Sequence, residues 1–527
     1  MPPRLTLPPT PAVLALMVAA FALPGLTMHD PWKPFDVIGI EIVRQMQLTG
    51  DWLVPRVAGE PWLEDPPLYH WVALAFAGLF EGLLQFHNAA RLASGAFVLA
   101  AAWFLWRAGG ALAPLLLIGC TGLLVHAHET VPDLSTLACA CAALLVLARA
   151  GERPLLHGAL FGAATGMAFL STGFTNAGAL LATAWILHAL SPRLRGSGAI
   201  MFLGAATLAA VAIGGSWPLA LWLRSPELVA TWWESGARLH GNPATNLRYF
   251  ASTAVWFAWP AWPLAAWAVW SSRSRLLDPA LLAPLLAVAT MFAAIVLAGP
   301  PQDINHTTLL APLALLGAQG VPHLRRGAAN ALDWFGVMTF AFFAGLVWLG
   351  WFAMMTGVPA RMANNFVKTA PDFVARFDAV ALLVAAALTL AWGVLAFNTA
   401  PSAPRSVARW AGGVALLWGV FSMLWMPWAD HIKSYRPVAA ALKRSLPAGG
   451  DCIAQRNLGV PQLAALSYHG GIVTRPYDPA KPAACPLLLV QGNPREETDV
   501  PGPQWLRVAE AGRPGDKHER FRLYRLP

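Results

Sequence analysis

The chain has 527 residues, of which 57% are hydrophobic and only 12% are charged. Soluble domains carry about 25% charged residues, so this composition excludes an ordinary soluble protein over most of the length. The net charge of +9 does not indicate nucleic-acid binding, because the basic residues mostly flank apolar runs, where they set membrane topology.

The charged residues divide the chain into two parts. From Trp428 onward, charges occur every few residues, whereas before it long apolar runs are broken only by short polar stretches. We therefore predict a membrane body over residues 1–427 and a soluble domain over residues 428–527, which is close to the common domain size.

Apolar runs that suit membrane crossing recur through the body. A spanning helix needs about 20 mostly apolar residues, and the first run, near the N-terminus, has no convincing cleavage site for a signal peptide. We predict thirteen spans, at 10–27, 88–106, 111–126, 132–149, 155–171, 174–190, 198–222, 250–271, 278–298, 303–319, 331–356, 376–397 and 407–427.

The arginines orient these spans. With the N-terminus in the cytoplasm, each inside segment is short and carries at least one arginine and no lysine, as the positive-inside rule requires. The inside arginines are Arg4, Arg107, Arg149, Arg153, Arg193, Arg195, Arg273, Arg275, Arg325, Arg326, Arg405 and Arg409. An odd number of spans then places the C-terminal domain in the periplasm of a bacterial inner (plasma) membrane.

The first outside segment, residues 28–87, is too long to be a simple connector, and loops of this length in a compact body are usually functional. Residues 36–48 place apolar side chains on one face, which predicts an amphipathic helix at the membrane surface. Gly50 ends this helix, and Pro66 and Pro67 begin a second, apolar helix.

Two acidic residues of this segment stand at the starts of surface helices. Asp36 begins the amphipathic helix, and Glu64 precedes the apolar one. Most acidic residues of the segment are expected to be helix caps or solvated charges. A carboxylate close to the membrane plane, however, could act as a base or hold a divalent cation.

The C-terminal domain has the pattern of a small α/β fold. Residues 452–454, 487–490, 505–509 and 521–526 resemble short strands, and residues 461–468 resemble a helix. Its sequence contains neither a phosphate-binding loop nor a catalytic triad.

The five cysteines fall into two groups. Cys120, Cys139 and Cys141 lie within apolar runs and are expected to be small buried hydrophobic residues. Cys452 and Cys485 could form a disulfide if their domain is periplasmic.

The first outside segment also carries recognisable motifs. Residues 50–56 read GDWLVPR, residues 59–71 read GEPWLEDPPLYHW, and residues 90–92 read ARL. In these motifs the chain resembles the bacterial aminoarabinose lipid A transferases. That family stands with the protein O-mannosyltransferases among the polyprenyl-phosphate-dependent, GT-C-type membrane glycosyltransferases. The thirteen spans, the outside domain and the PLALL run at 312–316 also match it.

The resemblance implies an α-helical polytopic fold of the GT-C type and a transferase. The implied enzyme moves a sugar from undecaprenyl phosphate, a polyprenyl phosphate, to lipid A or another cell-envelope acceptor at the periplasmic face. A carboxylate activates the acceptor, and basic groups or a divalent metal cation stabilise the departing phosphate. The implied partners are the lipid-linked sugar, the acceptor and membrane lipids, without nucleic acid.

The resemblance also assigns roles to particular residues. Asp36 and Asp133 are the candidate catalytic carboxylates, and Glu64 is the candidate metal ligand. The candidate substrate-binding residues are Arg238, Arg56 and His306.

Several family positions are substituted. The family's Asp-Glu pair reads Phe35-Asp36, so Asp36 takes the catalytic position only if the backbone shifts by one residue. The family's phosphate-contacting Lys is replaced by Asp65. Elsewhere, neutral or acidic residues replace a basic residue, a metal-binding His or a Tyr: these are Thr172, Glu234, Gln302 and Asn305.

These substitutions leave other readings open. One is a catalytically degenerate relative that binds a lipid-linked sugar or assists a partner enzyme. Another is a secondary transporter, which is disfavoured because the spans hold almost no charged residues and show no inverted repeat. The sequence names neither the sugar nor the acceptor.

Overall fold

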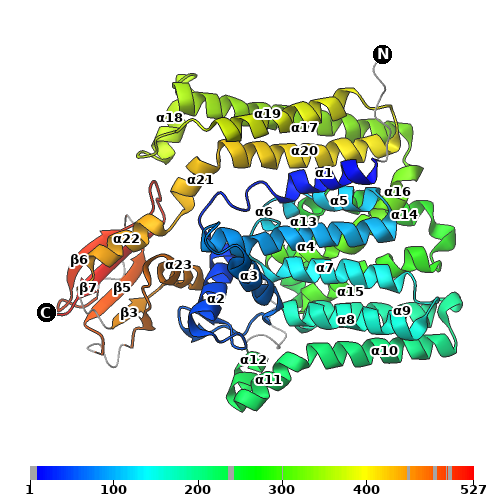
Figure 1. Cartoon of the computed structure of the whole chain (residues 1–527), viewed down its shortest axis with the longest axis horizontal. Coiled ribbons are helices and arrows are strands. Elements are labelled where there is room, and N and C mark those ends of the chain that lie inside the picture. The colour runs from blue at the N-terminus through cyan, green and yellow to red at the C-terminus, as the bar shows by residue number, and fades with distance from the viewer. Residues whose placement is uncertain are drawn as a thin grey trace.

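The computed structural model describes residues 9–234, 242–298, 301–447, 452–478, 484–493, 495 and 501–527. Most long helices run along the long axis of the molecule, and a small sheet domain lies at one end (Figure 1). Seven helical segments of the described chain are long and apolar enough to cross a membrane, so the chain is a multi-pass membrane protein. They are α4 (Phe86–Gly109), α8 (Pro154–Thr172), α10 with α11 (Ser197–Gly214 and Ser216–Arg224), α15 (Pro279–Ala298), α17 (Arg326–Thr356), α19 (Ala379–Phe397) and α20 (Ala403–Leu424).

The other predicted spans coincide with shorter helices. They are α1 (Pro11–Ala22), α5 (Leu112–Gly119), α6 (Leu123–His126), α7 (Pro132–Leu147), α9 (Phe174–Leu190), α13 (Pro243–Phe257), α14 (Ala261–Ser271) and α16 (Leu310–Gly320). Short 3-10 turns are η1 (Pro192–Leu194), η3 (Arg273–Arg275), η4 (Asp303–Leu309) and η5 (Val321–His323). Four of the thirteen segments are therefore broken: 111–126, 198–222, 250–271 and 303–319.

Two of these breaks satisfy each other's backbone groups. The Thr121 amide donates to the Trp259 carbonyl at 3.1 Å, and the Gly122 amide donates to the Phe257 carbonyl at 2.9 Å. A Cβ at Gly122 would overlap the Phe257 ring, so the close approach requires glycine. Broken helices are tolerated at membrane depth when neighbouring protein pairs the freed groups.

The segments predicted to lie outside gather at one end of the helical bundle, here called the loop-rich end (Figure 1). Its helices and first ribbon are α2 (Phe35–Thr49), β1 (Arg56–Val57), β2 (Glu60–Pro61), α3 (Leu68–Leu79), α12 (Pro226–Trp232), α18 (Ala360–Thr369) and α21 (Met426–Lys433). The expected amphipathic helix is confirmed as α2, which Gly50 ends with a left-handed φ of 68°.

The C-terminal domain is the small α/β fold that the sequence predicts. Its sheet has the order β4-β3-β5-β7-β6, with β3, β4 and β5 parallel and β7 antiparallel to both neighbours. Leu487 and Leu489 pack on one face of the sheet, and Leu488 and Val490 on the other. The elements are α22 (Arg436–Ser445), β3 (Ile453–Arg456), α23 (Val460–Gly470), β4 (Arg475–Pro476), β5 (Leu487–Gly492), β6 (Leu506–Ala511) and β7 (Arg520–Arg525).

The C-terminal domain is fastened to the first outside segment. Arg436 forms an ion pair with Asp30, its Nε donating to Oδ2 at 2.9 Å, and the Ser434 hydroxyl donates to the same carboxylate at 2.6 Å. On α2, Glu41 accepts a 2.6 Å hydrogen bond from Ser467 of α23. The apolar face of α2 also shares a hydrophobic core with α22, α23 and the sheet.

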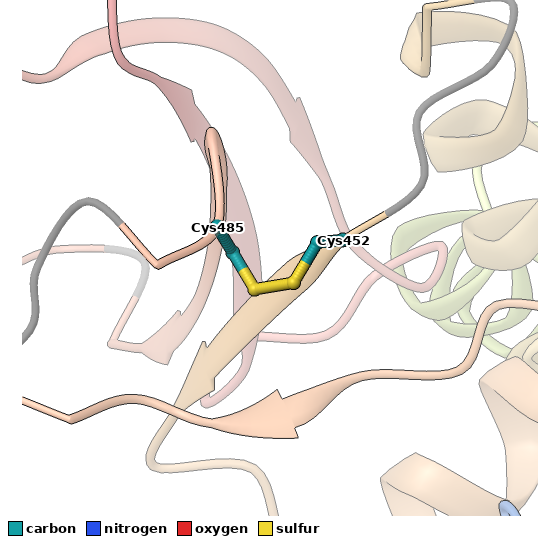
Figure 2. Close-up of a disulfide and its surroundings, with 2 residues drawn as sticks. All are labelled: Cys452 and Cys485. Carbon is teal, nitrogen blue, oxygen red and sulfur yellow. A yellow bond between two sulfur atoms is a disulfide. The ribbon is translucent and has the colours of Figure 1, made fainter.

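A disulfide joins Cys452 and Cys485, as Figure 2 shows. It links the start of β3 to the segment that enters β5, across a sequence separation of 33 residues and a Cα–Cα distance of 4.9 Å. The remaining cysteines of the described chain, Cys120, Cys139 and Cys141, are buried and reduced, as expected.

Replacing both Cys452 and Cys485 by serine should destabilise the C-terminal domain by about 2–4 kcal/mol, because the unfolded chain loses a cross-link. The thermal unfolding midpoint of the detergent-purified protein measures this. Alkylation of denatured protein without reductant should label three of the five cysteines. Labelling of all five would contradict the disulfide.

Candidate functional site

A cavity of about 890 Å³ opens at the loop-rich end of the bundle. Its wall is built by the start of α2, the segment that enters α3, the N-termini of α7 and α9, the end of α15, η4 and the first turn of α23. The C-terminal domain contributes Val460 and Pro461 to this wall. The cavity therefore combines elements from almost the whole length of the chain.

Three carboxylates line this cavity. Glu64 and Asp65 lie on the segment between β2 and α3, and Asp133 lies in the first turn of α7. Pro132 occupies the first position of α7, and the partial positive charge of a helix N-terminus stabilises a carboxylate there. The structure thus brings together Glu64 and Asp133, two of the residues selected from the sequence.

Asp65 is the most strongly perturbed of these groups. Burial raises the pKa of the Asp65 carboxyl well above its ordinary value, and the negative charges of Asp133 and Glu64 raise it further. The substitution of an acidic residue for the family's Lys therefore creates a cluster of like charges on the cavity wall.

Asp36 does not line the cavity. Its side chain is fully buried behind the wall and forms an ion pair with Arg91 of α4, with Nη2 to Oδ2 at 2.8 Å. It also accepts the Thr130 amide at 2.8 Å and the Trp32 amide at 3.3 Å. Burial alone would raise the Asp36 pKa, but the Arg91 charge and these hydrogen bonds hold it below its ordinary value.

The neighbouring residue, Phe35, lines the cavity instead. Asp36 therefore does not line the cavity, and the catalytic role that the resemblance implies for it stays a prediction. The contacts of Asp36 are those of a structural residue.

Two of the three candidate substrate-binding residues, His306 and Arg56, do not line the cavity. His306 is 1% exposed, and its ring nitrogens each lie 3.0 Å from a main-chain carbonyl, that of Asp303 or of Phe250. Arg56 donates to the Gly59 carbonyl at 3.1 Å, on the β1–β2 ribbon. Arg238 lies outside the described residues.

Most of the substituted family positions face the cavity. Thr172, Gln302 and Asn305 line it, whereas Glu234 does not. Among the described residues of the wall there is neither lysine nor arginine. The wall is thus acidic and neutral where the resemblance implies cations for a lipid phosphate.

Two further polar residues line the cavity without having been selected from the sequence. His70 lies in the first turn of α3, and Asn176 lies in the first turn of α9. Both are buried, and both carry side-chain atoms without a hydrogen-bond partner. Only the position of His70 inside the 59–71 motif could have drawn attention to it, because the lack of partners is a property of the folded chain.

A metal site does not follow from these side chains. The described residues contain no group of three or more His, Cys, Asp or Glu arranged to hold a metal ion. Glu64 lies at the cavity, but the described residues around it do not complete a set of metal ligands.

Comparisons with known proteins agree with this architecture. No family model matches the chain. It is similar to the undecaprenyl phosphate-alpha-4-amino-4-deoxy-L-arabinose arabinosyl transferases of Aeromonas hydrophila (29% identity over 227 residues) and Pseudomonas aeruginosa (30% over 261 residues). These matches cover 41% and 45% of each protein, so the chain matches less than half the length of the curated relatives.

The structural comparison covers almost the whole molecule. The crystal structure of ArnT from Cupriavidus metallidurans bound to undecaprenyl phosphate matches with a TM-score of 0.69 and 18% identity, over 97% of both chains. The ligand-free ArnT crystal structure from the same organism matches with a TM-score of 0.68. The chain therefore has the fold of ArnT, which agrees with the resemblance first seen in the loop motifs.

Replacing Arg91 by methionine should destabilise the protein by about 3–5 kcal/mol, because it leaves the Asp36 carboxylate buried without its cation. The thermal unfolding midpoint of the purified protein measures this loss. The double variant Arg91→Met with Asp36→Asn should recover part of the midpoint, since the uncompensated charge is gone. An unchanged midpoint in Arg91→Met would contradict a structural role for the pair.

Replacing Asp65 by asparagine should stabilise the protein above about pH 4. A carboxyl whose pKa is higher in the folded state lowers stability as pH rises from the unfolded pKa, about 4, through the folded pKa. The gain should be largest at the highest pH and should shrink on acidification toward pH 4. Unfolding midpoints across this range test it, with Glu60→Gln on exposed β2 as the control. A gain that does not vary with pH would contradict the raised Asp65 pKa.

Proposed function

We propose that this chain is a membrane glycosyltransferase that moves a sugar from undecaprenyl phosphate to lipid A or another envelope acceptor. The ArnT fold over 97% of the chain supports this, as do the names of the relatives in sequence. The observation that carries the proposal is a cavity lined by carboxylates at the loop-rich end, where a lipid-linked donor would meet an acceptor from the aqueous side.

The proposed reaction is a single displacement. A nucleophilic oxygen of the acceptor attacks the anomeric carbon, the bond from that carbon to the phosphate oxygen breaks, and the lipid phosphate leaves with the electron pair. If the nucleophile is a hydroxyl, Asp133 accepts its proton as general base. Asp133 is preferred over Asp36 for this role because Asp133 lines the cavity, whereas Asp36 is buried against Arg91.

The charge of the cavity favours a particular kind of sugar. Glu64, Asp65 and Asp133 line the wall, and no lysine or arginine lines its described part. Such a wall attracts a cation and repels an acidic sugar. An amino sugar carrying an ammonium group fits it, and the relatives in sequence are named for 4-amino-4-deoxy-L-arabinose.

The same wall favours one other function. Phe35 at the position of the family's catalytic Asp, and neutral residues at its cationic positions, suit a degenerate relative that binds a lipid-linked sugar without transferring it. This alternative predicts binding without turnover.

We also propose that the loop-rich end faces the periplasm, with the N-terminus in the cytoplasm. The arginine placement supports this, and so does the disulfide, because disulfides persist in oxidising compartments. The C-terminal domain then closes one side of the cavity through α23. Glu64 stays the candidate ligand for a divalent cation, and the transfer assay tests this by varying the cation.

Transfer of aminoarabinose from undecaprenyl phosphate to lipid A by the purified protein tests the proposed function, with mass spectrometry of the lipid A product. Asp133→Asn should reduce the rate at least 100-fold, as loss of a general base does. Glu64→Gln should also reduce it, because it removes a cavity carboxylate. Glu60→Gln, which lies on exposed β2 outside the cavity, should leave it unchanged.

The outcomes separate the candidate functions. Full activity in Asp133→Asn would contradict the catalytic assignment. Binding of the lipid-linked sugar without any product, with every acceptor offered, would favour the degenerate relative. Running the assay with and without EDTA decides whether a cation takes part.

A further inference from the structure

His70 is an unusual histidine. It is 1% exposed and lines the cavity, yet neither Nδ1 nor Nε2 has a hydrogen-bond partner. Its one described ring contact is with Tyr69, perpendicular at 5.7 Å between centroids, and that contact satisfies neither nitrogen. A buried polar group without a partner costs free energy, so native proteins contain few of them and each requires an explanation.

Other buried histidines of the chain are paired. The ring nitrogens of His128 lie 3.0 Å from the Leu124 carbonyl and 2.8 Å from the Phe21 carbonyl. His306 is held in the same way by two carbonyls. In the part of the chain that the structure describes, His70 is the one histidine whose two ring nitrogens are both buried and unpartnered, and it faces the cavity.

A second buried atom on the cavity wall shares this property. Asn176 donates from Nδ2 to the Thr172 hydroxyl at 3.2 Å, but its Oδ1 has no partner. Asn176 and His70 come from different helices, α9 and α3, and both line the cavity. Two helices thus each bring buried polar atoms without a partner to the same cavity. We infer that a polar ligand forms the missing hydrogen bonds.

We propose that His70 is a substrate-binding residue whose ring nitrogens form hydrogen bonds with a hydroxyl of the sugar on the lipid donor. This inference rests on the proposed function, because it assigns the sugar to the cavity that the transferase reading describes. It gives His70 a role in sugar recognition rather than in breaking a bond.

The chemistry of the ring favours a hydroxyl over a phosphate. Burial lowers the His70 pKa to about 3, so the imidazole is neutral at physiological pH and presents one donor and one acceptor. A hydroxyl also presents a donor and an acceptor, which matches both. A phosphate offers only acceptors to this site, and Glu64, Asp65 and Asp133 on the same wall would repel it.

His70→Phe tests the proposal, because phenylalanine keeps the ring and removes the two nitrogens. The thermal unfolding midpoint of this variant should equal or exceed that of the unmodified protein. The matched control, His128→Phe, should lower the midpoint, because it removes the ring N–H that donates to one of the two neighbouring buried carbonyls.

Binding is then measured with two probes, undecaprenyl phosphate and undecaprenyl phosphate-linked aminoarabinose, by calorimetry in detergent. His70→Phe should weaken binding of the sugar-bearing lipid at least 10-fold and leave that of undecaprenyl phosphate unchanged. His70→Gln, which retains a donor and an acceptor, should restore a large part of the affinity. Since the readout is binding, it is separate from turnover, whose absence would count against the proposed function alone.

Several results would overturn the proposal. A midpoint for His70→Phe as low as that of His128→Phe would show a structural role. An equal loss of affinity for both lipids would assign His70 to the phosphate or the chain. Unchanged affinity of His70→Phe for the sugar-bearing lipid would contradict a contact between His70 and the sugar. Failure of the unmodified protein to prefer this lipid over undecaprenyl phosphate would contradict it as well.

Discussion

The ion pair between Asp36 and Arg91 holds the loop-rich end together. Arg91 also donates to the carbonyls of Leu26 and His29, while Asp36 accepts the amide of Thr130, so α2, α4 and two connecting segments meet at one buried charge pair. A Cβ at Gly39 would lie 2.1 Å from the Thr130 carbonyl, which shows how tightly α2 is pressed against this segment. Buried ion pairs fix one arrangement when both partners are present, and here that arrangement turns Phe35 toward the cavity.

The cavity that results has an unusual balance of chemistry for its fold. Its carboxylates are on the wall, its described part has no lysine or arginine, and three of its described buried polar residues, His70, Thr130 and Asn176, have unpaired atoms. A site of this kind recognises a ligand through hydroxyl and ammonium groups more readily than through a phosphate. The fold therefore determines where this cavity lies, while the side chains on its wall set its charge.

Much of this structure can be predicted from local sequence, and the rest depends on contacts between residues far apart in the chain. Hydropathy predicted the helical segments, and the continuous apolar run at residues 487–490 predicted a buried strand, because both patterns depend on neighbours in the chain. Glu64 was selected because it precedes a surface helix and Asp133 because of the family resemblance, and both line the cavity. The orientation of Asp36 could not be predicted, since it depends on Arg91, 55 residues later. The open nitrogens of His70 exist only in the packed structure.

The fastening of Asp30 to Arg436 has a consequence for the assembly of this protein during its synthesis. These residues are 406 positions apart. At about 5 to 20 residues per second, a ribosome needs about 20 to 80 s to pass from one to the other. Throughout that interval the first outside segment is already made but lacks α22 and α23, so its Asp30 and Glu41 have no partners from that domain and one side of the cavity is open. The earliest loop to emerge is thus among the last to mature, and a nascent chain halted before α23 holds only part of the cavity wall.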